Sequence, residues 1–167
     1  MFENYAIGVC RIEPENNIHV ILEAFADSPL PLIMVGNWEN SVYGKELLER
    51  YRDNTHILMH PSIYDHAQLD VLRRGCRLYV HGHSCGGTNP SLVEAMYLGL
   101  PIAAFDVNFN RETTEDRALY FKDADGLRDL LTALDDSELR KVADAMKEIA
   151  DRRYTWKRIA GLYADLF

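Results

Sequence analysis

The chain has 167 residues, of which 47% are hydrophobic and 26% are charged, which is typical of one soluble globular domain with its own core. Its formal net charge of -8 argues against nucleic-acid binding, because phosphate backbones need a basic surface. No apolar run approaches the roughly 20 residues that span a bilayer, so no transmembrane segment is expected.

Six short apolar segments predict β-strands at residues 5–10, 32–35, 56–59, 78–80, 102–105 and 118–121. Amphipathic segments predict helices at about 15–26, 43–52, 67–73, 91–98 and 126–134, with two further helices at 137–150 and 154–167. Strands that alternate with helices predict an α/β fold, a Rossmann-like doubly wound parallel sheet with helices on both faces. In such folds the ligand lies beyond the carboxyl ends of the strands. We expect a single domain over residues 1–167.

The three cysteines, Cys10, Cys76 and Cys85, fall on or beside predicted strands. Their number and placement favour reduced thiols over a disulfide framework. No signal peptide is recognisable, so we expect a cytoplasmic protein.

The segment after the fourth predicted strand is a glycine-bearing loop followed by a helix that begins at Pro90. Gly86 and Gly87 would let the backbone approach a ligand closely, and the free amides of Ser91 and Leu92 would point outward. A helix start with free donors and a positive dipole end favours an anion such as phosphate.

Three polar residues at this helix start, Thr88, Asn89 and Ser91, could serve only as a helix cap, although a cap and a phosphate site are compatible. The two glycines beside Asn89 favour a ligand loop. Glu94, one turn into the helix, could accept hydrogen bonds from sugar hydroxyls, or could be an exposed carboxylate favoured by the helix dipole. The segment predicts a nucleotide or nucleotide-sugar site.

The string Ser91-Leu-Val-Glu-Ala-Met-Tyr-Leu-Gly-Leu-Pro resembles the donor-site segment of the retaining, family 4 type (group 1) glycosyltransferases of GT-B architecture. The resemblance implies that the helix amides bind the donor diphosphate, that Glu94 binds ribose, and that the donor is a dTDP-, UDP- or GDP-sugar. The longer string from His81 to Ala95 resembles rhamnosyltransferase-like enzymes of bacterial surface polysaccharide synthesis, which implies transfer of rhamnose or another hexose.

One position departs from the family pattern, which has glutamates eight positions apart: the earlier glutamate is replaced by Gly86. Since the family assigns that carboxylate to the donor sugar, we expect His83 and Ser84 to face the sugar or phosphate instead. The spacing of His81, His83 and Cys85 could also place three metal ligands on one face of an extended strand. No second ligand cluster follows, and the resemblance implies metal-independent catalysis without a cofactor, so we expect Cys85 to be a small packing residue.

The segment after the first strand resembles the family's first strand-loop-helix, where an arginine and a lysine grip the diphosphate. Arg11 matches the arginine and is, with Glu94, the residue we nominate for catalysis. Asn16 stands at the lysine position and could donate only as a neutral group. The alternatives are an ion pair of Arg11 with Glu13 or Glu15, and simple helix-start chemistry for Asn16.

Two loops at the same edge of the predicted sheet extend the site. In related enzymes the loop at residues 60–65 borders the nucleobase, which Ile63 and Tyr64 could cover, although the tyrosine could instead pack on the following helix. The polar loop at 106–114 resembles the family's loop near the donor sugar, or is a simple connection. Trp38 and Trp156 are expected to be packing residues.

The C-terminal string from Arg153 to Tyr163 resembles the closing helix of GT-B transferases, which crosses to an N-terminal acceptor domain. The helices from about residue 137 would pack on that missing domain. The resemblance therefore implies the donor-binding half of a larger enzyme that binds but does not turn over alone. Its partner would be a glycan or lipid-linked acceptor, and the full-length enzyme could work at the inner face of the membrane.

Two other function classes stay open. A sugar-nucleotide epimerase half-domain has the same architecture and needs no acceptor. A non-catalytic nucleotide-binding module would be consistent with the absent first glutamate and the absent lysine.

Overall fold

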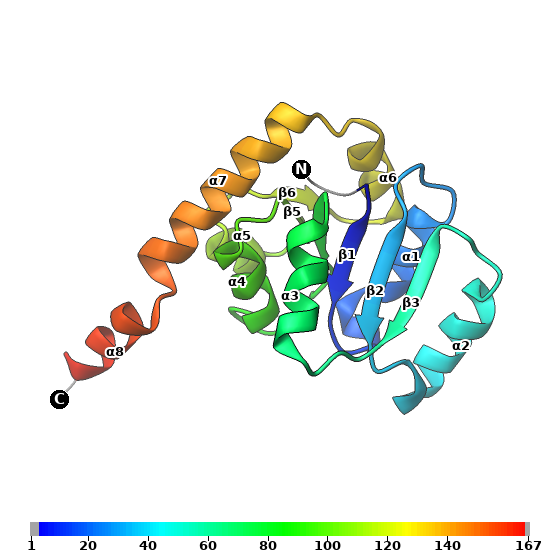
Figure 1. The fold of residues 1–167 in the computed structure, drawn as a ribbon, viewed down its shortest axis with the longest axis horizontal. Helices are drawn as coiled ribbons and strands as arrows, with labels where there is room; N and C mark the ends of the chain where they lie inside the picture. The colour runs from blue at the N-terminus through cyan, green and yellow to red at the C-terminus, as the bar shows by residue number, and fades with distance from the viewer. Residues whose placement is uncertain (1–3, 166–167) are drawn as a thin grey trace.

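The computed structural model describes residues 4–165, and its centre is a six-stranded parallel β-sheet (Figure 1). The strands are β1 (Ala6–Val9), β2 (Leu32–Gly36), β3 (Ile57–Pro61), β4 (Leu78–His81), β5 (Ile102–Phe105) and β6 (Leu119–Phe121). Their order is β3-β2-β1-β4-β5-β6, so the direction of winding reverses between β1 and β4. The carboxyl ends of these two central strands are where such sheets bind ligands.

Helices cover both faces of the sheet, as the alternation of strands and helices predicted. They are α1 (Ile18–Phe25), α2 (Val42–Tyr51), α3 (His66–Gly75), α4 (Pro90–Tyr97), α5 (Asn108–Thr113), α6 (Ala124–Thr132), α7 (Asp136–Arg153) and α8 (Trp156–Ala164), with short 3₁₀ helices η1 (Pro14–Asn16) and η2 (Trp38–Asn40). Figure 1 shows α3 in front of the sheet and α1 behind it. The predicted α/β fold class, a Rossmann-like doubly wound parallel sheet, is confirmed.

The core has two layers because successive residues of each strand face opposite sides of the sheet. Ala6 packs with residues of α1, α2 and α6, whereas its neighbour Ile7 packs with residues of α4 and α7. Both layers are fully buried at β1, which explains why the strands are nearly continuous in apolar character.

One predicted loop is wrong: residues 106–114 contain the helix α5 rather than an irregular connection. The sequence pattern missed it because the segment is short and polar, without a 3.6-residue apolar period. Its stability comes from tertiary burial, since Asn110 and Thr113 are buried although they are polar.

The C-terminal helix α8 lies beyond the end of α7 and away from the sheet (Figure 1). Trp156, which we expected to be a packing residue, is 89% exposed, so that prediction is wrong, while Trp38 is 3% exposed as predicted. The predicted helix at 154–167 is present as α8, which runs from Trp156 to Ala164, and the last two predicted positions lie outside the described residues. Among residues 4–165, no helix is both long enough and apolar enough to cross a bilayer.

Candidate functional site

The loops that follow β1 and β4 are fastened to each other at the carboxyl edge of the sheet. The side chain of Asn17 donates to the carbonyl of Gly82 at 2.9 Å, and both the amide and the hydroxyl of Ser84 donate to the carbonyl of Glu15, at 2.9 and 2.8 Å. A Cβ at position 82 would lie 2.1 Å from the carbonyl oxygen of Asn16, so only glycine permits this approach. The two segments predicted to hold the donor therefore lie side by side.

Within the first of these loops, Arg11 and Asn16 have different environments. The side chain of Arg11 is 72% exposed and pairs with Glu13 at 3.2 Å, as one of the two readings predicted. Asn16 is buried, and its side-chain amide donates to the Arg11 carbonyl at 2.7 Å. That amide shapes the loop that carries Arg11, and contact with a phosphate would require it to leave this position. The phosphate role of Arg11 stays a prediction.

Two histidine rings are stacked at the end of β4, with the centroids of His81 and His83 4.4 Å apart. The pKa of His83 is lowered to about 4, mainly by burial and in part by the Arg11 guanidinium, while Glu15 partly opposes this. Burial also holds the pKa of His81 well below its usual value. Both rings are therefore neutral near pH 7, and the half-buried His83 can both donate and accept hydrogen bonds at this edge.

Asn110 of α5 is a residue whose position the sequence did not predict. It is fully buried, and its side-chain amide donates to the carbonyls of His83 at 3.0 Å and Phe105 at 2.8 Å. It thus ties the end of β5 to the segment that follows β4 and fixes the backbone at His83. A polar residue in an apparent loop carries no signal of this role.

In the glycine loop, the free amides are not the ones that the sequence predicted. Gly86 has a φ of +114°, and a Cβ at Gly86 or Gly87 would meet no atom within 4 Å. The amides of Ser91 and Leu92 are not free as predicted, because both donate to Asn89: Ser91 to its side-chain oxygen at 3.0 Å and Leu92 to its carbonyl at 3.1 Å.

Asn89 therefore acts as the helix cap, one of the two roles considered for it. The amides that stay without an acceptor among the described residues include those of Gly86, Gly87 and Thr88, a few positions earlier along the loop. The donors available to a ligand therefore lie in the glycine loop itself.

Glu94 lines a cavity of about 630 Å³ formed by α3, α4 and the start of α8, and Thr88 and Pro90 lie at the same cavity. Its side chain is 48% exposed, and its Oε2 accepts a hydrogen bond from Nη2 of Arg73 at 2.8 Å. Arg73 is 3% exposed and comes from α3. Nothing in the sequence pointed to Arg73, because its partner lies 21 residues away and only the packing of α3 on α4 joins them.

The loop between β3 and α3 carries the two residues predicted to border a base. Ile63 packs against the core beneath the sheet edge, whereas Tyr64 is 87% exposed. The alternative in which the tyrosine packs on the following helix is therefore wrong. A ligand contact of Ile63 or Tyr64 stays a prediction.

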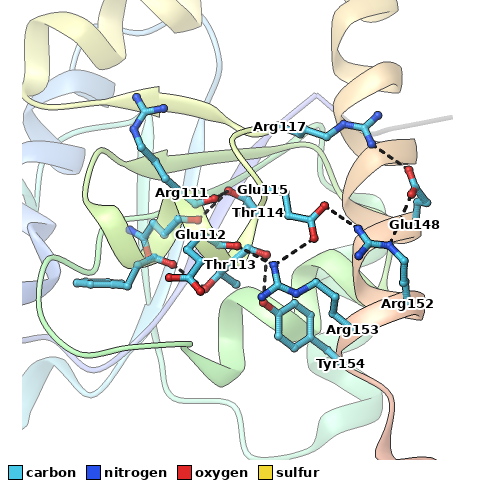
Figure 2. Close-up of polar contacts among 12 residues, drawn as sticks. Arg111, Glu112, Thr113, Thr114, Glu115, Arg117, Glu148, Arg152, Arg153 and Tyr154 are labelled. Atoms are coloured by element: carbon cyan, nitrogen blue, oxygen red, sulfur yellow. Dashed lines mark hydrogen bonds and ion pairs between the residues drawn. The ribbon is translucent and has the colours of Figure 1, made fainter. Parts of the chain in front are cut away.

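A polar cluster fixes α5 and the turn after it against the end of α7 (Figure 2). Glu115 accepts hydrogen bonds from Arg152 at 2.6 Å and from Arg153 at 3.1 Å. The hydroxyl of Tyr154 donates to the carbonyl of Thr113 at 3.2 Å and closes the cluster on the side of α8. We call this set the α5–α7 cluster, and it also includes Arg111, Glu112, Thr114, Arg117 and Glu148.

Arg111, which the sequence placed in a possible donor loop, is engaged within this part of the molecule. Its guanidinium pairs with Asp106 at 2.5 Å and with Asp116 at 2.9 Å, and it lies over the ring of Tyr120 at 4.1 Å. The hydrogen bond from Arg111 lowers the pKa of Asp106. These contacts account for Arg111 as a structural residue of the connection.

The cysteines are free thiols, but they differ in burial. Cys76 is buried, and burial raises the pKa of Cys76 and of Cys10 to about 12. Cys85 is exposed, so the expectation that it packs in the interior is wrong. Within residues 4–165, no group of three or more His, Cys, Asp or Glu side chains has the arrangement of a metal site.

Comparison with known proteins connects this geometry to a family. The sequence model described as "Glycosyl transferases group 1" matches residues 2–153. The chain belongs to this family. No curated protein sequence matches it.

Several solved structures share its fold. HepE of Anabaena in complex with UDP-glucose has a TM-score of 0.83 and 21% identity over 98% of this chain and 48% of that one. The C-terminal domain of the group 1 glycosyl transferase LpcC of Francisella tularensis has a TM-score of 0.76 and 18% identity over 93% and 89%. Sucrose-phosphate synthase of Thermosynechococcus elongatus has a TM-score of 0.80 and 22% identity over 99% and 46%. The chain thus spans about half the length of HepE and of the synthase.

Proposed function

We propose that this domain binds the nucleoside-diphosphate sugar donor of a group 1 glycosyl transferase. The proposal rests on one observation: a half-exposed carboxylate and free backbone amides lie at the same carboxyl edge of the sheet. Glu94 lines the cavity beside α4, and the loop that leads into that helix presents the amides of Gly86, Gly87 and Thr88, which have no acceptor in the part of the chain that the structure describes. Such a combination suits a ligand with sugar hydroxyls at one end and phosphates at the other.

Each part of the donor has a candidate partner. The amides of Gly86 to Thr88, the positive end of the α4 dipole and the exposed guanidinium of Arg11 would hold the diphosphate. Glu94 would accept hydrogen bonds from the ribose hydroxyls, and the loop with Ile63 and Tyr64 would border the base. HepE, which shares this fold, is in complex with UDP-glucose, and this supports a nucleotide-sugar donor here. The choice of a UDP-, dTDP- or GDP-sugar comes from the sequence resemblance alone.

The chemistry of transfer would place new negative charge on the departing diphosphate. Arg11 and the loop amides would stabilise this charge as hydrogen-bond donors, which is why we expect transfer without a metal ion. The neutral His83 ring, with Ser84 beside it, would face the donor sugar at the place where Gly86 replaces the family's first glutamate.

The larger reaction is also part of the proposal and is supported by the sequence resemblance alone. The full-length enzyme would transfer rhamnose or another hexose, with retention of anomeric configuration, to a glycan or lipid-linked acceptor of a bacterial surface polysaccharide at the inner face of the membrane. The acceptor would be held by an N-terminal domain, so this domain should bind donor without turning it over.

Calorimetric titration with UDP, GDP, dTDP and ADP, without metal and then with Mg²⁺, tests the donor site. We expect binding of at least one of the first three, unchanged by Mg²⁺ and weakened about tenfold in Glu94→Ala, because a hydrogen bond to a charged acceptor is lost. Equal affinity of the wild type and the variant would overturn the assignment of Glu94, and sensitivity to Mg²⁺ would overturn metal independence.

A further inference from the structure

Arg73 is a buried cation whose contact with the candidate site is made through Glu94. Its guanidinium is 3% exposed, donates from Nη2 to Glu94 Oε2 at 2.8 Å, and lies 3.7 Å from a carboxylate oxygen of Asp70. Within the described residues, the Nε of Arg73 has no hydrogen-bond partner, and neither does the second oxygen of Glu94.

Helix geometry brings the arginine to this place. His66, Asp70 and Arg73 are spaced by four and three residues, so they form one stripe of α3, and all three line the cavity beside Glu94. Side chains on a helix lean toward its N-terminus, which here is the end of α3 at the carboxyl edge of the sheet. The guanidinium therefore reaches from the last turn of α3 toward the site.

Stability alone does not account for this residue. Removal of a guanidinium from water is costly, and an apolar side chain of similar size often stabilises a protein as well as a buried ion pair does. A half-exposed glutamate, however, has three rotatable bonds and would sample several orientations in water. A fixed charged donor on one of its oxygens restricts these orientations and leaves the second oxygen for a ligand.

We propose that Arg73 is a positioning residue that holds the Glu94 carboxylate in the orientation that accepts hydrogen bonds from the ribose hydroxyls of the donor nucleotide. The inference rests on the proposed function, since it assumes that Glu94 faces the ribose. Arg73 is 3% exposed and contacts Glu94, so in this proposal it acts on the ligand through Glu94. Its loss should weaken recognition of the ribose hydroxyls and leave recognition of the diphosphate intact.

The test compares the affinities for UDP and for its 2′,3′-dideoxy analogue, which lacks both hydroxyls. We expect the wild type to prefer UDP on the order of tenfold. Glu94→Gln and Arg73→Met should both lower this ratio to about threefold or less, and Arg73→Lys should give an intermediate ratio because one charged donor is restored. A purely structural role would change the melting temperature without changing the ratio. Arg74→Met is the matched control, since Arg74 lies on the exposed side of the same helix.

The outcomes separate the two proposals. If Glu94→Gln loses the preference and both Arg73 variants keep it, the positioning role is overturned while the donor site stands. If the wild type shows no preference for UDP over the dideoxy analogue that depends on Glu94, the ribose site and the role of Arg73 are both overturned. Should Arg73→Met fail to fold, Arg73→Lys decides alone: an unchanged ratio overturns the inference, and a ratio lowered by about threefold supports it.

Discussion

Two regions of the molecule use ion pairs in opposite ways. The cavity between α3 and α4 holds one buried arginine against Glu94, whereas the α5–α7 cluster ties many charged side chains together at the surface, with exposures from about a third to more than half. A buried charge is costly if its partner is removed, while an exposed pair contributes little because water and salt replace it. Burial, rather than the number of ion pairs, therefore decides which charges matter for stability.

The largest effect is expected at the ion pair that contains the buried arginine, Arg73. Glu94→Ala should lower the free energy of unfolding by about 3 kcal/mol, because it leaves Arg73 buried with only Asp70 nearby, at 3.7 Å. Urea denaturation of the wild type and the variant measures the difference. A loss below about 1 kcal/mol would mean that water reaches the guanidinium and that the two regions do not differ as described.

The next largest loss of stability is expected at Asn110, which connects α5 to the end of β5 and to the segment that follows β4. Asn110→Ala should cost about 2 kcal/mol, because the carbonyls of His83 and Phe105 lose their shared donor in a buried place. The same urea experiment applies, with Asn108→Ala on the exposed side of α5 as control. Equal losses in the two variants would show that the two hydrogen bonds of the Asn110 side chain are not responsible, since alanine favours a helix more than asparagine does.

The pH dependence of the free energy of unfolding should distinguish the contribution of the histidines after β4 from that of the carboxylates near the α5–α7 cluster. Since the folded-state pKa of His83 is about 4 and its ordinary value is 6.5, the unfolded chain binds more protons between these values. Stability should therefore rise between pH 4 and 6.5, by about 1 kcal/mol from this partly exposed ring. His83→Gln should reduce that rise, while the part that comes from the lowered pKa of His81 remains, and His56→Gln, at an exposed position, should not reduce it.

The carboxylates near the cluster act at lower pH. Their arginine partners lower the pKa of Asp106 and of Glu115, so their contribution is present above the ordinary values of 3.8 and 4.5 and is lost as the pH falls through the folded-state values. In His83→Gln, the free energy of unfolding should thus still fall as the pH drops below about 4. If His83→Gln removed this fall as well as reducing the rise at higher pH, the assignment of the fall to the carboxylates would be contradicted.

The smallest effect is expected within the cluster itself. Glu148→Ala removes the partner of Arg117 at 2.9 Å, but both side chains are more than half exposed. The loss of stability should be less than about 1 kcal/mol and should shrink further at high salt. A loss as large as that of Glu94→Ala, unaffected by salt, would show that the cluster is cooperative rather than a set of independent surface pairs.

The sequence predicted each strand to within about two residues, because strands buried on both faces are visible as apolar runs. It missed α5, whose polar residues have no periodic pattern and are buried only by distant partners. It misplaced Trp156, since an aromatic residue has the same sequence signal whether or not another surface covers it. In the candidate site it indicated Glu94 but not Arg73, because a contact between two helices leaves no local trace.

What the sequence by itself determined is the order of strands and helices, the glycine loop before α4 and membership in the group 1 family, all of which are written in residue type and spacing. Only the tertiary structure decided which amides of that loop are free, that Asn16 and Asn110 point inward, and that Arg73 holds Glu94. The physical reason is that these features depend on which segments meet at the carboxyl edge of the sheet. Burial and hydrogen-bond partners there are set by residues far apart in the chain.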